Sequence, residues 1–79
     1  EVNISPNPTS GPVNIYIPGN DSVVEITMNN MMGSMILQTN QAIPFNRMLD
    51  LDLSHLNAGT YLIKLSGNTV RTVSKLVKY

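Results

Sequence analysis

Hydrophobic and polar residues alternate most clearly between residues 49 and 67, LDLDLSHLNAGTYLIKLSG. Leu49, Leu51 and Leu53 are separated by single aspartates, which is the period of a strand with one buried face. Residues 54–59 interrupt this pattern with Asn and Gly, which adopt turn geometry at low steric cost. The alternation then resumes from Tyr61 to Ser66. We predict a strand, a turn and a second strand here, and we expect the other segments to pair with them.

Short apolar or alternating segments recur through the rest of the chain, with Gly, Pro or Asn between them. Their spacing of roughly 8–12 residues is typical of an antiparallel β-sandwich. The linkers at 29–34 and 67–68 have the composition of hairpin loops. We therefore predict an all-β chain of six to seven short strands, at residues 2–4, 13–17, 23–28, 35–39, 45–53, 61–66 and 69–79.

The last predicted strand has no clear buried face. One face would carry Val73, Val77 and Tyr79, and the other Thr72, Ser74 and Leu76. Such ambiguity is often found in an edge strand or in a strand that is paired on both sides. The unpaired backbone groups of an edge strand can pair with another chain. The same open edge allows two domains to exchange strands, so a strand-exchanged homodimer is an alternative to the monomer.

Length and charge narrow the class of protein. The chain has 79 residues, which is enough for one domain, 1–79. Because residues 2–4 resemble the end of a strand or linker, we expect this domain to be cut from a longer protein.

The formal net charge is zero, which argues against a nucleic-acid partner, since phosphate binding needs a basic surplus. Four of the five basic residues nevertheless follow residue 63, and no acidic residue follows Asp52.

The sequence gives little support to an enzyme, a cofactor or a metal site. Cysteine is absent, no apolar run reaches the roughly 18 residues of a membrane helix, and no signal peptide is visible. The single histidine, His55, lies in a turn without a recognisable catalytic partner. Asp50 and Asp52 share a strand face and could act as a carboxylate pair, but a solvated strand face explains them better. Asp21 is interpreted in the same way.

Methionines and aromatics leave two interpretations open. Met31, Met32 and Met35 could form an adaptable binding patch, although core filling is the favoured interpretation. An accessory module that binds a surface ligand such as carbohydrate would need exposed aromatic rings. The chain has only four aromatic residues, and we expect at least two of them in the core.

Four motifs, in order, resemble those of a known family. Residues 6–11, PNPTSG, look like its opening PNPxxG, and residues 28–36 are similar to its middle apolar segment with a turn glycine, Gly33. Residues 51–65 contain the Gly59-x-Tyr61 pattern before an apolar strand. Residues 75–78, KLVK, match its terminal basic–apolar–apolar–basic signature. The chain thus resembles the C-terminal sorting domain of the type IX secretion system of Bacteroidetes, type A, the Por secretion tail.

This resemblance implies an immunoglobulin-like β-sandwich that acts as an address for secretion. The cargo would cross the periplasm, where translocon and shuttle proteins of the outer membrane recognise the domain. The cargo would then reach the cell surface or the medium. A sortase-like cysteine protease at the cell surface commonly removes such a domain and attaches the cargo to lipopolysaccharide. The domain would be a substrate and not a catalyst.

We expect the terminal strand to carry recognition, through Lys75, Leu76, Val77 and Lys78. Main-chain pairing along an open edge would supply affinity, and the two lysines would supply electrostatic steering. The remaining motif residues are expected to be structural: Pro6, Asn7, Pro8, Gly11, Gly33, Gly59 and Tyr61.

Overall fold

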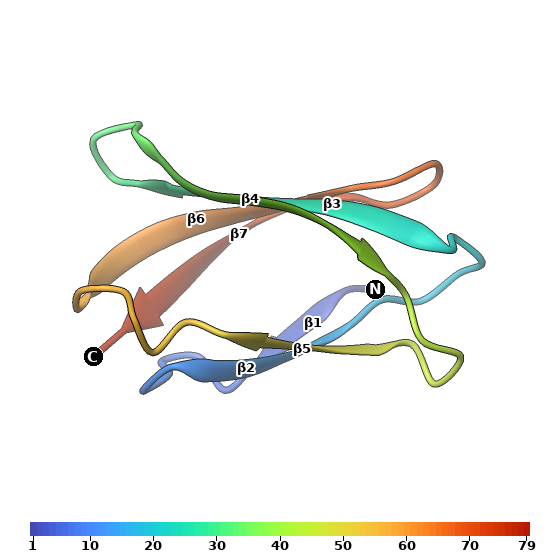
Figure 1. Ribbon diagram of the computed structural model, residues 1–79, viewed down its shortest axis with the longest axis horizontal. Helices are drawn as coiled ribbons and strands as arrows, with labels where there is room; N and C mark the ends of the chain where they lie inside the picture. The colour runs from blue at the N-terminus through green and yellow to red at the C-terminus, as the bar shows by residue number, and fades with distance from the viewer.

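Seven strands form two antiparallel sheets that pack face to face (Figure 1). The computed structural model describes all residues, 1–79. One sheet has three strands in the order β1-β2-β5, and the other has four in the order β4-β3-β6-β7. The strands are β1 (Asn3–Ser5), β2 (Pro12–Tyr16), β3 (Val23–Asn30), β4 (Met35–Ala42), β5 (Met48–Asp52), β6 (Gly59–Ser66) and β7 (Arg71–Lys78). The predicted all-β sandwich is confirmed.

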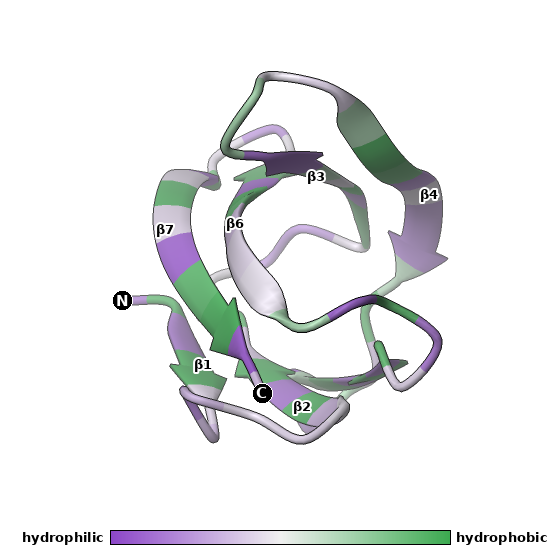
Figure 2. Ribbon diagram, turned by 90° about the vertical axis from the view of Figure 1, so that its left-hand side faces the viewer, coloured by the Kyte–Doolittle hydropathy of each residue, from purple (hydrophilic) through white to green (hydrophobic).

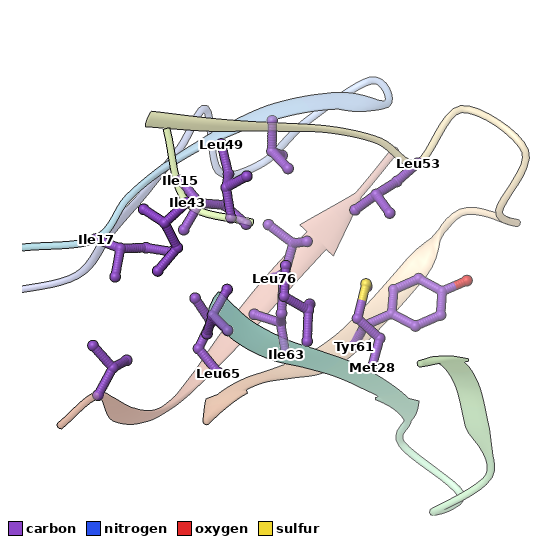
Figure 3. Close-up of a cluster of buried hydrophobic side chains, with 14 residues drawn as sticks. Ile15, Ile17, Met28, Ile43, Leu49, Leu53, Tyr61, Ile63, Leu65 and Leu76 are labelled. Carbon is purple, nitrogen blue, oxygen red and sulfur yellow. The ribbon is translucent and has the colours of Figure 1, made fainter. Parts of the chain in front are cut away.

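The period-2 pattern of the sequence places the core between the sheets. Each long strand directs alternate apolar side chains inward, as Val24, Ile26 and Met28 do on β3. These side chains meet others from β2, β5, β6 and β7 in one continuous cluster of 14 buried residues (Figure 3). Because both sheets contribute to a single cluster, the chain has one hydrophobic core.

The stretch 49–67 joins the two sheets. Its strands, β5 and β6, belong to different sheets, so the turn between them crosses the sandwich and does not form a hairpin. β5 pairs with β2, while β6 pairs with both β3 and β7. The predicted hairpins at 29–34 and 67–68 are confirmed, since β3 pairs with β4 and β6 pairs with β7.

Tyr61 closes this crossing connection. Its ring is buried near Met28 and Leu53 at the edge of the core (Figure 3). Its hydroxyl donates a hydrogen bond of 2.6 Å to the carbonyl oxygen of Asn57, four residues earlier. A tyrosine that bonds back to the preceding corner is a feature of immunoglobulin-like sandwiches. Together with the strand order, it identifies the fold as immunoglobulin-like.

Several predictions of burial and extent are wrong. The strand predicted at 45–53 begins only at Met48, because residues 44–47 form a turn, and Phe45 is fully exposed. Of the four aromatic residues only Tyr61 is buried, not the two or more expected. Met31, Met32 and Met35 are also exposed, Met32 by 91%, and they do not fill the core. They occupy or border a hairpin that projects beyond the sandwich, where an apolar side chain has no second layer to meet.

Candidate functional site

The opening motif and the terminal motif, far apart in sequence, lie against each other. The side-chain amide of Asn7 donates to the carbonyl oxygen of Lys75 at 2.8 Å, and its oxygen accepts from the backbone N–H of Val77 at 2.9 Å. One side chain therefore takes the place of a peptide group from a neighbouring strand. Figure 2 shows the end of β7 beside the loop that follows β1.

Thr9 extends this contact to the end of the chain. Its N–H donates to the carbonyl oxygen of Val77 at 2.9 Å, and its carbonyl oxygen accepts from the N–H of Tyr79 at 3.0 Å. The Thr9 hydroxyl is buried, where it donates to Pro12 O and accepts from Gly11 N. Thr9 is thus held on both sides, and it forms a short parallel bridge with Lys78.

These contacts divide the outer edge of β7 into two parts. From Lys75 to Tyr79 the edge is covered by Asn7 and Thr9. From Arg71 to Ser74 no strand pairs with it, because β6 is the only strand partner of β7. The outer edge of β7 is therefore open only over residues 71–74. The main-chain pairing expected along residues 75–78 would meet an edge that Asn7 and Thr9 already occupy.

The four terminal motif residues point to opposite sides of the sheet. Leu76 is buried in the core with 1% of its surface exposed, so its face is the inner one. Lys78 lies on the same face and is also largely buried, with its Nζ 3.4 Å from the carbonyl oxygen of Tyr79. Lys75 is exposed and Val77 half-buried on the outer face. Lys75 and Val77 are therefore the two motif residues on the solvent side of the sheet.

The remaining motif residues lie in turns and at strand ends. Pro6 and Pro8 are exposed on either side of Asn7 in the turn that covers β7. Gly11 is buried, and its carbonyl oxygen accepts from the N–H of Leu53 at 2.8 Å. Gly33 closes the β3–β4 hairpin by donating to the carbonyl oxygen of Asn30 at 3.0 Å. Gly59 begins β6, two residues before Tyr61.

Sequence reasoning missed a buried carboxylate, Asp21, which was assigned to a solvated face. Only 7% of Asp21 is exposed. Its carboxylate accepts hydrogen bonds from the backbone N–H and hydroxyl of Thr69 at 3.0 and 2.8 Å, and from the N–H of Val70 at 3.2 Å. These bonds, the backbone bond from Thr69 first among them, lower the pKa of Asp21. The position of Asp21 in a Pro-Gly-Asn-Asp turn was the only sequence signal of such a role.

Arg47 supports the same corner of the molecule. Its Nε donates to the carbonyl oxygen of Ile17 at 2.8 Å and its Nη1 to that of Asp21 at 2.9 Å. The guanidinium also contributes to the lowered pKa of Asp21. Asp21 and Arg47 therefore join the β2–β3 and β4–β5 connections to the β6–β7 turn. Their role is to hold these three loops together.

Two further polar side chains that the sequence singled out, His55 and Asp52, lie in or next to the β5–β6 connection. His55 is exposed, as the sequence indicates. The Asp52 carboxylate accepts from the hydroxyl and N–H of Ser54, which lowers the pKa of Asp52. No group of three or more His, Asp or Glu side chains is placed to hold a metal ion. A helix with the length and apolarity to span a bilayer is absent from the fold.

The structure thus defines a class of protein: an immunoglobulin-like sandwich whose first turn and last strand are bound to each other. Residues 3–79 match the family model of the secretion system C-terminal sorting domain. The chain belongs to this family, and it is a C-terminal sorting signal for type IX secretion. Such a signal directs export to the cell surface or secretion, and the family is not known as catalytic. No curated protein sequence matches the chain.

Proposed function

We propose that the type IX secretion machinery recognises this domain through the C-terminal half of β7. The observation that carries the proposal is the contact of the opening turn with residues 75–79, which fixes the terminal motif in one conformation. Because the backbone of this segment is already held, binding through its outward side chains costs less conformational entropy than binding of a free chain end. The partners are the outer-membrane translocon and its shuttle proteins.

The four residues of the terminal motif have different roles in this proposal. Lys75 and Val77, on the outer face, contact the machinery, and the Lys75 ammonium steers an acidic partner surface. Leu76 anchors the strand in the core. Lys78 covers the end of the sandwich with its aliphatic stem, and its charge remains near the chain end.

The proposed route follows from this role as an address. The domain lies at the end of a longer cargo protein, passes through the periplasm and is recognised there in folded form. A sortase-like cysteine protease at the cell surface then removes it. In this route the domain is a substrate of the protease and not a catalyst.

Export of a fusion protein tests the proposal. Residues 1–79 would be fused to a periplasm-targeted fluorescent reporter in a Bacteroidetes host, beside a fusion that ends at Ser74. Because the truncation also removes Leu76 from the core, a sharper variant is Lys75→Glu, which changes only an exposed side chain. Arg71→Glu is the matched control, since Arg71 is exposed on the same strand outside the terminal motif.

We expect the 1–79 fusion and Arg71→Glu to reach the surface or medium, and Lys75→Glu to remain in the periplasm although folded. Circular dichroism of the purified domains would establish folding. Export of Lys75→Glu at the level of the unchanged domain would show that this strand is not the recognised segment.

The alternative function is a module that binds carbohydrate. Tyr16, Phe45 and Tyr79 are exposed, which leaves more rings available than the sequence suggested. However, Tyr16 ends β2, whereas Tyr79 bonds to Thr9, which precedes the start of that strand. The rings therefore do not all gather on one platform. A glycan-array signal that disappears in Tyr16→Ala would favour this alternative.

A further inference from the structure

The outer face of the four-stranded sheet has an apolar hollow beside the β3–β4 hairpin. Its volume is about 250 Å³, and its apolar walls are Met31, Leu62 and Val73. These side chains are 62, 39 and 64% exposed, although each is large and apolar. Asn29 lines the hollow on the hairpin side, and Lys64 lies at its opposite wall. The hollow is therefore an unfilled apolar site next to a cation.

Strand register brings a second lysine, Lys75, next to the wall of the hollow that holds Lys64. Lys64 lies opposite Val73, and Leu62 lies opposite Lys75, so apolar and cationic side chains alternate across β6 and β7. The two lysines are diagonal neighbours, and long side chains at such positions reach the same partner. The only carboxylate on this face of the sheet, Glu25, accepts a hydrogen bond of 2.8 Å from Gln38 on the opposite side of β3.

We propose that this hollow binds an extended segment of another protein in which one large apolar side chain is flanked by carboxylates. The apolar side chain lies between Leu62 and Val73, and its contact area includes the flexible Met31 side chain, which adapts to different shapes. The flanking carboxylates reach Lys64 and Lys75, whose charges lack an acidic partner across the strand pair.

The positive charge beside the hollow favours an acidic segment over the other ligands that could bind there. A basic segment would meet two lysines, and a sugar would find no aromatic ring among the residues that line the hollow. A second copy of the chain offers Asp50 and Asp52 on β5, but Leu51 between them packs against its own core, and the Asp52 carboxylate already binds Ser54. An acidic segment of a different protein meets neither difficulty. This inference shares Lys75 with the proposed function, but its test is binding to the purified domain and leaves Lys75 unaltered, so a failure here and a failure of export are distinguishable.

The test is a titration of the ¹⁵N-labelled 79-residue chain with the peptide acetyl-Glu-Glu-Phe-Glu-Glu-amide, followed by NMR. We expect saturable shifts at the amides of Leu62, Lys64 and Val73, with a Kd of about 1 mM or below. Replacing the four Glu with Gln should weaken binding about fivefold, because exposed ion pairs contribute modestly. Replacing Phe with Ala should abolish saturation. Added salt should weaken binding by screening the charges.

Variants of the domain locate the site. Val73→Thr keeps the size of the side chain but makes the wall polar, and Lys64→Gln removes the cation. We expect each to weaken binding of the Phe peptide severalfold. The matched controls are Val23→Thr and Arg71→Gln, which make the same changes at exposed positions outside the hollow. Both controls should bind like the unchanged chain.

Three results would overturn the proposal. One is the absence of saturable shifts up to about 10 mM peptide, where a 1 mM site would be nearly full. Another is equal binding of the Gln peptide, or an equal loss in the control variants. The third is a shift of the same amides with protein concentration alone, which would identify a second copy of the chain as the occupant.

Discussion

Two glycines show how the space around a residue distinguishes positions that share the same backbone angle. Gly11 and Gly59 have nearly the same φ, 157° and 158°, in a region that L-residues rarely adopt. A Cβ on Gly11 would lie 2.9 Å from the backbone Cα of Ser54, whereas a Cβ on Gly59 would have no atom within 4 Å. The backbone contributes similar strain at both positions, so only the contact with Ser54 distinguishes them.

We therefore predict that Gly11→Ala destabilises the domain more than Gly59→Ala. The expected difference is about 1–3 kcal/mol in the free energy of unfolding, as for overpacking at a rigid site. Urea denaturation of both variants measures it, with the difference in midpoints as the readout. Equal midpoints would mean that the turn near Ser54 yields without cost.

Asp21 gives the stability of the domain a dependence on pH. Its pKa is lowered in the folded state, chiefly by the hydrogen bond from the backbone N–H of Thr69. The unfolded chain therefore binds the proton more tightly than the folded chain. The stabilisation from Asp21 is complete above the ordinary aspartate pKa, near 4, and is lost as pH falls through the lower folded value.

We predict that Asp21→Asn unfolds at lower urea concentration than the unchanged domain at pH 7, and that the two midpoints converge as the solution is acidified below about pH 4. Asp50→Asn is the control, because Asp50 is exposed on β5 and its side chain makes no hydrogen bond comparable to those of Asp21. A constant gap between Asp21→Asn and the unchanged domain from pH 7 to pH 2 would contradict the assignment.

At the scale of elements, β7 is completed by a side chain. Asn7 bonds to Lys75 O and Val77 N across the outer edge, where a neighbouring strand would otherwise pair. Covering an edge is a recognised way of preventing association between sheets. The cover ends at Lys75. The C-terminal half of β7 is therefore protected from pairing with another strand, whereas residues 71–74 are open to it.

We predict that Asn7→Ala exposes the Val77 amide to solvent. Its hydrogen exchange should accelerate strongly, while exchange at Leu76, which pairs with β6, should change little. Loss of two exposed hydrogen bonds should cost about 1 kcal/mol of stability. Asn7→Asp is the comparison, because it keeps an acceptor for Val77 N but loses the donor to Lys75 O. Equal acceleration at Leu76 and Val77 would indicate that the whole strand detaches.

The sequence predicts most strands because strand periodicity is a local property. The alternation of Leu49, Leu51 and Leu53, or the hairpin at 67–68, needs no knowledge of distant residues. By contrast, the contact of Asn7 with β7 spans 68 and 70 residues, and that of Asp21 with Thr69 spans 48. No pattern within a short window contains such contacts, so these roles became visible only in the structure.

At the scale of the whole molecule, charge is sorted between the two outer faces. Lys64, Arg71 and Lys75 lie on strands of the four-stranded sheet, whereas Asp50 and Asp52 lie on β5 of the three-stranded sheet. The net charge of zero therefore conceals a basic face and an acidic face. Sequence analysis found the basic block but could not assign it to a face, because the last strand has no regular alternation. The burial of Leu76 and Lys78 in the structure shows which side is inner.

The contact between the first turn and the end of β7 also bears on the order of events during synthesis. A ribosome makes a chain from its N-terminus, so Asn7 exists before its partners Lys75 and Val77 do. The outer edge of β7 therefore gains its cover only after residues 75–79 have been made. A product that stops before Lys75 would lack this contact, and its first turn would have no strand edge to bind.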